Sequence, residues 1–195
     1  MKATLVQPTE ASLDAVFANP STVFVASPWI STDGVKLLDR IWKRTPCTKW
    51  EIWTRLDPMD FLQGTSDFEA ILAFAKGEAG RTVQIRVSSE LHMKFYWGGG
   101  PEALLCSANL SSAGFGRNIE SGVALEGTPG EFSGFLGSLR NRVRPVSISD
   151  LESRVRRLAS LLPIREKLSE VLKMAGDSLG QPLRAVDEVV YPSLR

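Results

Sequence analysis

Residues 91–120 read LHMKFYWGGGPEALLCSANLSSAGFGRNIE and contain the only histidine of this 195-residue chain. His92 stands two residues before Lys94, next to the apolar run 93–97. Side chains two residues apart on a β-strand point to the same face. The spacing therefore predicts a strand on which an imidazole and an ammonium group lie side by side.

Two further runs follow the same pattern. Ser107 and Asn109 are two residues apart within the apolar run 103–110, and Glu120 opens the run 119–125. Polar groups at positions where a strand is otherwise apolar break the local pattern, and such breaks tend to mark functional sites. We therefore expect these three strands to carry a site.

The residues before this stretch alternate between helical and strand patterns. Helices are expected at 9–19, 33–43 and 67–76, and strands at 22–26, 49–56 and 82–87. Alternation of this kind predicts parallel strands with helices packed on them. The strands after residue 91 are joined by connections too short for helices, which favours antiparallel pairing. The expected fold is α/β, a mixed β-sheet flanked by helices, with further helices at the C-terminus.

The C-terminal part of the sequence is helical and basic. A helix is expected at 129–143, and two amphipathic helices separated at Pro163 follow it. We predict a catalytic domain over residues 1–143 and a C-terminal helical segment over 144–195 that serves packing, dimerisation or nucleic-acid contact. Residues 140–173 have a net charge of +5, although the whole chain has only +1. This charge suits either a polyanion-binding surface or a solvated helical face.

Composition narrows the class of protein. Apolar residues make up 43% of the chain, enough for a core, and no apolar run reaches the roughly 18 residues that a membrane span needs. The first ten residues lack the apolar core of a signal peptide, and the two cysteines are distant in sequence. The expectations are a cytoplasmic protein with free thiols and no stable membrane association.

The residue types in the central stretch suit chemistry at a phosphodiester. A neutral imidazole is a nucleophile near pH 7, and Lys94 offers positive charge to a phosphate. Asn109 and Ser107 offer hydrogen-bond donors, whereas an ionised Glu120 accepts and can orient an imidazole. The sequence has no second histidine or cysteine–histidine spacing typical of a metal site, so neither a metal nor a cofactor is expected.

These residues resemble a known motif. His92-Met93-Lys94, Ser107-Ala108-Asn109-Leu110 and Asn118-Ile119-Glu120 are similar to the HKD motif of the phospholipase D superfamily, and the resemblance covers roughly residues 5–140. It implies that His92 forms a phosphohistidine intermediate and that Lys94 and Asn109 bind the phosphate. Ser107 would lie beside them as a substrate contact, and Glu120 would support the imidazole.

The chain departs from that motif in two respects. The motif's aspartate would fall at Gly99, in a glycine run that favours a hairpin turn over a phosphate cradle. The motif also occurs once, whereas family members combine two motifs in one active site. The resemblance therefore implies a homodimer with the site on its two-fold axis.

The same residues also suit purely structural roles. His92 can be a hydrogen-bonded neighbour of the core, Asn109 can shape a loop, and Glu120 can pair with Lys94 or Arg117. Arg117 suits a surface charge as well as a substrate contact. Lys94 is the hardest to explain structurally, because a buried lysine needs a partner.

The function expected from these observations is a metal-independent phosphodiesterase, most of all an endonuclease that cleaves DNA, or RNA, in a homodimeric site. The alternatives are a lipid phosphodiesterase or phosphatidyltransferase, and a catalytically silent nucleic-acid-binding module. A helicase or methyltransferase of a defence system is a conceivable protein partner.

Overall fold

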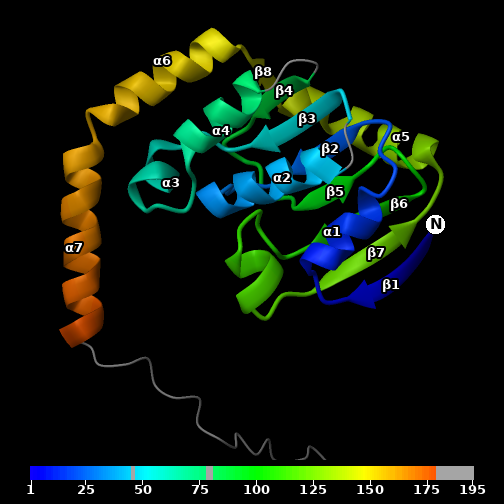
Figure 1. The fold of residues 1–195 in the computed structure, drawn as a ribbon, viewed down its shortest axis with the longest axis horizontal. Helices are drawn as coiled ribbons and strands as arrows, with labels where there is room; N and C mark the ends of the chain where they lie inside the picture. The colour runs from blue at the N-terminus through cyan, green and yellow to red at the C-terminus, as the bar shows by residue number, and fades with distance from the viewer. Residues whose placement is uncertain (45–46, 78–80, 179–195) are drawn as a thin grey trace, which may run out of the picture.

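The computed structural model describes residues 1–44, 47–77 and 81–178 (Figure 1). Its elements follow in the order β1 (Lys2–Val6), α1 (Glu10–Val16), β2 (Val23–Ala26), α2 (Thr32–Arg44), β3 (Lys49–Thr54), α3 (Pro58–Leu62), α4 (Phe68–Lys76), β4 (Thr82–Val87), β5 (Phe95–Trp97), β6 (Glu102–Cys106), the π-helical turn η1 (Ala113–Arg117), β7 (Gly122–Glu126), α5 (Pro129–Leu139), the 3-10 turn η2 (Arg140–Arg142), β8 (Arg144–Val146), α6 (Ile148–Ala159) and α7 (Leu162–Ser178).

The strands form one sheet in the order β1-β7-β6-β5-β2-β3-β4-β8. The neighbours β2, β3 and β4 are parallel, and the other neighbouring pairs are antiparallel. This confirms the mixed sheet flanked by helices. The sequence did not indicate the two edge strands: β1 is largely exposed, and β8 has three residues including a proline, which only an edge strand tolerates.

Helices cover both faces of the central strands (Figure 1). Alternate residues of β2 show why: Val23 and Val25 belong to the core beneath α1, α2 and α4, whereas Phe24 and Ala26 belong to the core beneath α5. Strands buried on both faces are continuous apolar runs, as β2 is. The sheet is therefore the middle of three layers.

The helix ends agree with their local signals. Thr9 caps α1 and Asp67 caps α4 with side-chain acceptors, and Gly77 ends α4 with φ +48°. The expected helices therefore appear with shifts of a few residues. The helix expected at 129–143 stops at Leu139 and continues as η2. The short elements α3 and η1 were not predicted, because single turns have too few residues for a periodic pattern.

The strands around the site are shorter than expected. The runs 93–97, 103–110 and 119–125 form strands only over Phe95–Trp97, Glu102–Cys106 and Gly122–Glu126. Phe95 pairs with Ala26, the last residue of β2, after which Pro28 turns the chain away. Beyond these ends only single backbone hydrogen bonds continue, such as Cys106 N to Lys94 O at 3.1 Å and Ser107 N to Ser121 O at 2.8 Å. The polar residues thus lie just beyond the strand ends, which corrects the prediction that they sit on the strands.

The sheet continues past the expected domain boundary, because β8 pairs with β4. Leu151 and Leu158 of α6 are buried in the same core as the helices on that face. α7 runs down one side of the molecule past α3 (Figure 1). The guanidinium of Arg165 on α7 lies 4.8 Å from the ring centre of Phe61 on α3. The last part of the C-terminal segment, 179–195, lies outside the described residues. None of the described helices is long and apolar enough to span a membrane.

Candidate active site

One edge of the sheet collects the residues of the site. Ala26 at the end of β2 pairs with Phe95 at the start of β5, and Phe95 pairs with Leu105 near the end of β6. Cys106 in turn pairs with Gly122 at the start of β7. In this arrangement the end of one strand meets the start of its neighbour. Loops far apart in sequence therefore converge beside the carboxyl end of β2.

His92 and Lys94 lie together at this edge. His92 is exposed, whereas Lys94 is only 6% exposed. The Lys94 ammonium donates a hydrogen bond to the His92 carbonyl oxygen at 3.1 Å and lies 3.5 Å from Nε2 of the imidazole. The two side chains do not share a strand face as predicted, because the segment precedes β5. The flexible lysine stem still brings its charge to the imidazole.

Among the residues that the structure describes, the Lys94 ammonium has no ion-pair partner. No carboxylate of a described residue lies within ion-pairing distance of its Nζ. Burial lowers the pKa of Lys94 below its ordinary value, and the more distant Glu120 opposes the shift. A buried cation without a counter-charge favours binding of an anion, because the anion restores the lost solvation.

Trp29 forms a wall of the site that sequence reasoning did not assign. Its ring meets the His92 ring edge-on at 6.2 Å, and the Lys94 Nζ lies 5.7 Å from its centre. The indole N–H donates a 2.9 Å hydrogen bond to Oδ1 of Asp60, whose other oxygen lies 3.3 Å from Nε of Arg55. Burial raises the pKa of Asp60, and the bond from Trp29 opposes this. The Asp60–Arg55 pair therefore anchors the indole against the histidine.

Only the position of Trp29 offered a sequence signal, since the residue directly follows the turn that ends β2. No signal in the sequence marked Asp60. It lies on the five-residue helix α3, 31 residues after Trp29, and contacts Trp29 only because the chain folds.

Ser107 and Glu120 form a second group at the same edge. The Ser107 hydroxyl donates a short hydrogen bond to Oε2 of Glu120 and accepts one from the Ser121 N–H at 3.0 Å. Oε1 of Glu120 accepts from the Asn118 side chain at 3.1 Å. The Glu120 carboxylate is therefore held by Ser107 and Asn118, and it makes no hydrogen bond to His92 within the chain.

Asn109 carries a buried acceptor at the site. Its Oδ1 is buried and has no hydrogen-bond partner among the described residues. Leaving such an atom unpaired costs about 1–3 kcal/mol. The backbone beside it is fixed, because Ala108 O accepts from the Tyr96 hydroxyl at 3.0 Å and Leu110 N donates to Ser27 Oγ at 3.0 Å. The backbone on both sides of Asn109 is thus fixed, and the side-chain Oδ1 is left without a partner among the described residues.

Two other side chains complete the surroundings of the site. Arg117 is exposed on η1, and its charge helps to lower the pKa of Asp33 on α2, after the hydrogen bonds from Lys36 and Ser112. The backbone N–H of Cys106 donates to Lys94 O at 3.1 Å, and burial raises the pKa of the Cys106 thiol to about 11. A protonated thiol is a poor nucleophile at neutral pH, so His92 is the stronger candidate.

Gly99 lies at the far end of β5 from Lys94. It has φ +78°, and a Cβ there would approach Ser21 Oγ to 2.2 Å. At about 3.3 Å per residue, Gly99 is roughly 16 Å along the chain from Lys94. The position of the motif's aspartate is therefore occupied by a tight hairpin that has no room for a side chain.

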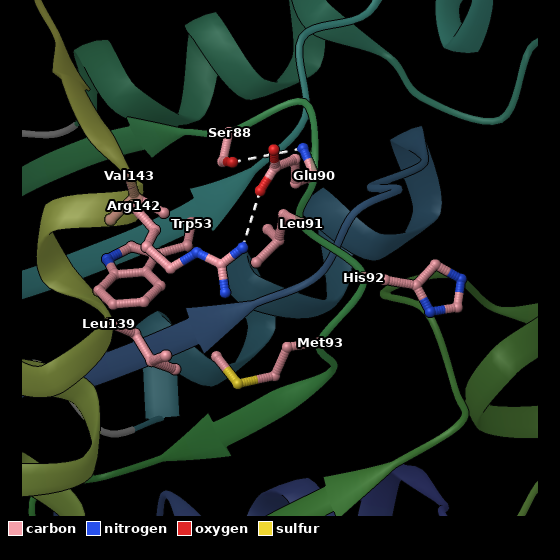
Figure 2. A pocket seen from close by; sticks show the side chains of 9 residues that line it. All are labelled: Trp53, Ser88, Glu90, Leu91, His92, Met93, Leu139, Arg142 and Val143. Carbon is pink, nitrogen blue, oxygen red and sulfur yellow. Dashed lines mark hydrogen bonds and ion pairs between the residues drawn. The ribbon is translucent and has the colours of Figure 1, made fainter.

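A pocket of about 140 Å³ lies behind the His92 segment, between it and η2. Figure 2 shows that the His92 imidazole projects away from the other lining side chains, so the pocket is not the space in front of the nucleophile. Arg142 and Glu90 span its mouth with an ion pair of 2.8 Å. Among the described residues, no group of three or more histidine, cysteine, aspartate or glutamate side chains is placed to hold a metal ion.

Known structures share this architecture. Nuc from Salmonella typhimurium, a phospholipase D family member, aligns with a TM-score of 0.51 at 16% identity over 74% of this chain and 99% of Nuc. Phosphatidylserine synthase of Haemophilus influenzae Rd KW20 aligns with a TM-score of 0.60 at 13% identity over 91% of this chain and 46% of the synthase. NucT from Helicobacter pylori aligns with a TM-score of 0.49 at 14% identity over 73% of this chain and 97% of NucT.

The likenesses to Nuc and to the synthase show that the chain has the phospholipase D superfamily fold, as the motif predicted. No protein-family model matches the sequence, and no curated protein matches it at a significant level. At these identities the structural likeness establishes the fold, and the chemistry has to be argued from the residues.

Proposed function

We propose that this protein is a metal-independent phosphodiesterase, and specifically an endonuclease that acts on DNA, in the cytoplasm. The observation that carries the proposal is the buried, unpaired ammonium of Lys94, 3.5 Å from the exposed imidazole of His92. Positive charge held beside a nucleophile suits attack on a phosphate, because it stabilises the charge that develops on the phosphoryl oxygens.

In the proposed reaction, the neutral imidazole of His92 attacks phosphorus, and the bond to the leaving oxygen breaks. The leaving oxygen takes a proton from His92 of a second copy, which acts as general acid. That neutral histidine then removes a proton from water, which attacks the phosphohistidine and releases His92. Lys94 and Asn109 hold the phosphate oxygens, and Ser107 contacts the substrate beside them.

Glu120 supports the site indirectly in this proposal. Its hydrogen bond with Ser107 keeps a negative charge near Lys94 without neutralising it. Arg117 is exposed on η1 at the rim and would contact the substrate away from the reacting phosphate.

A homodimer follows from the need for two histidines, because the sequence contains one. Exposed apolar side chains on α7 support self-association: they are Leu162, Ile164, Val171, Leu172 and Met174. We propose that residues 1–143 hold the catalytic site and that 144–195 serve assembly or nucleic-acid contact. A helicase or methyltransferase partner would be additional to this dimer.

The alternative substrate is a lipid phosphodiester, and the likeness of the fold to phosphatidylserine synthase is the observation in its favour. The basic residues of 140–173 favour nucleic acid instead.

The deciding experiment incubates the protein with DNA, RNA and phosphatidylcholine in excess EDTA. DNA cleavage that survives chelation, together with acid-labile and base-stable phosphate on the quenched protein, is expected. Activity that disappears with EDTA and returns with magnesium would contradict the mechanism, and turnover of the lipid alone would establish the alternative. Binding of DNA without any cleavage would indicate a silent module.

A further inference from the structure

A second groove lies beside the His92 segment, between the end of β4, β8 and α6. It measures about 450 Å³, and its polar lining is Ser88, Ser89, Asn141, Arg142, Arg144 and Arg154, with Asp57 at one side. We call it the arginine groove. It shares Ser88, Arg142 and Val143 with the smaller pocket of Figure 2, whose lining includes His92. The two hollows therefore share part of their lining, next to the segment that carries His92.

The fold itself gathers the arginines. Arg144 pairs with Val87 across the β4–β8 ladder, so its backbone lies beside the turn that carries Ser88 and Ser89. Arg154 arrives from α6, whose Leu151 and Leu158 are buried in the core. Because both elements are anchored by pairing or packing, the guanidinium groups are presented on a rigid frame.

The positive charge in the arginine groove is largely uncompensated. Arg144 and Arg154 form no ion pair or hydrogen bond with a described residue, and Arg142 pairs with Glu90 only at the exposed surface. The one lining acid, Asp57, accepts from Met59 N at 2.9 Å and lies 3.5 Å from Arg55. The groove therefore offers two unpaired guanidinium groups next to two serine hydroxyls.

This chemistry fits phosphate. A guanidinium group donates two parallel hydrogen bonds to phosphate oxygens, and hydroxyls add further donors. A single phosphate at His92 could not also occupy the groove, whereas a polynucleotide carries a phosphate on every nucleotide. We propose that the arginine groove binds the phosphodiester backbone of a nucleic-acid strand on one side of the cleaved phosphate. This inference rests on the proposed function, because it extends the same site along its substrate.

The test separates binding in the groove from chemistry at His92. The variant Arg144→Gln/Arg154→Gln removes both unpaired charges, and Lys2→Gln/Lys43→Gln removes two exposed charges on β1 and α2 outside both the groove and the segment 140–173. Hydrolysis of bis(p-nitrophenyl) phosphate, which is too short to reach the groove, should be unchanged in both. Binding of a fluorescent 20-nucleotide single strand should weaken about tenfold or more only in the groove variant.

Salt dependence gives a second readout. Each lost phosphate contact lowers the slope of log affinity against log salt by about 0.7 for a single strand, so the groove variant should lose roughly 1.4. Ser89→Asp, which adds a negative charge at an exposed groove position, should weaken binding in the same direction. If the double variant fails to fold, the affinity of the Ser89→Asp variant for the oligonucleotide still tests the groove.

The outcomes are distinguishable. Unchanged oligonucleotide affinity and salt slope in the groove variants overturn the inference, even when the diester is hydrolysed. So does a loss confined to phosphatidylserine vesicles, since the groove would then be a membrane contact. A wild-type protein that leaves the small diester intact overturns the proposed function, while the binding comparison still decides on the groove.

Discussion

Replacing Lys94 by methionine tests the central premise that a buried charge awaits an anion. Methionine has a similar length and removes the charge. In the free protein the ammonium is 6% exposed, donates to His92 O at 3.1 Å and has no carboxylate within ion-pairing distance among the described residues. The variant should therefore keep the fold, lose activity and lose most of its response to phosphate.

The size of the effect can be worked out for inorganic phosphate at a hundredfold excess over its Kd. Ligand binding then stabilises the wild-type fold by about 2.7 kcal/mol. For a chain of 195 residues, each kcal/mol raises Tm by about 2–4 °C, so the expected shift is roughly 5–11 °C. Losing one charged hydrogen bond, about 1.5–3 kcal/mol, weakens binding at least about tenfold. At the same phosphate concentration, the shift in the Lys94→Met variant should be about half or less.

The pH dependence provides a further check on the same residue. Burial lowers the pKa of Lys94 from 10.5 in the folded state, so between the lowered value and 10.5 the folded chain binds fewer protons than the unfolded chain. Stability contributed by this residue therefore rises with pH through that window. The free energy of unfolding of the wild type, relative to Lys94→Met, should increase as pH approaches 10.5.

Calorimetry of thermal unfolding measures both predictions: with and without phosphate it gives the Tm shift, and at a series of pH values it gives the stability difference. Lys2→Met is the matched control, because Lys2 is exposed on β1 and pairs with Glu126 far from the site. It should shift as the wild type does. A full phosphate shift in Lys94→Met, or a wild type that does not respond to phosphate, would refute the view of Lys94 as an anion-binding group.

Three further changes test other parts of the site. His92→Ala should abolish turnover and retain substrate binding, and mixed dimers with the wild type should be inactive or stalled. Near-normal activity of the variant would show that His92 is not catalytic. Trp29→Phe loses the 2.9 Å bond to Asp60 and should cost about 1.5–3 kcal/mol of stability in urea titration, with a lower kcat; unchanged values of both would leave Trp29 without a positioning role. Gly99→Asp restores the motif's residue at φ +78° against Ser21 and should destabilise the fold by roughly 1–3 kcal/mol or more without raising kcat, whereas a gain in activity would show that the hairpin can contribute a carboxylate.

The sequence by itself predicted the layered α/β fold, because that information is local. Alternating strand and helix patterns from residue 22 to 87, and the change to short connections after residue 91, indicated a mixed sheet. Hydrophobic periodicity depends only on neighbours along the chain, so it was legible without contacts. The motif also identified His92, Lys94 and Asn109 as the residues to examine.

Only the tertiary structure decided how these residues meet. The strands end before the polar residues, and a strand pattern in the sequence cannot show where pairing with a neighbour stops. Asp60 reaches Trp29 from another helix, and Arg144 and Arg154 are ten residues apart in sequence yet line one groove. Such contacts arise from sheet order and helix packing, which bring distant segments together. The sequence therefore determined the elements and the candidate site residues, and the packing determined which charges are buried, paired or left without a partner.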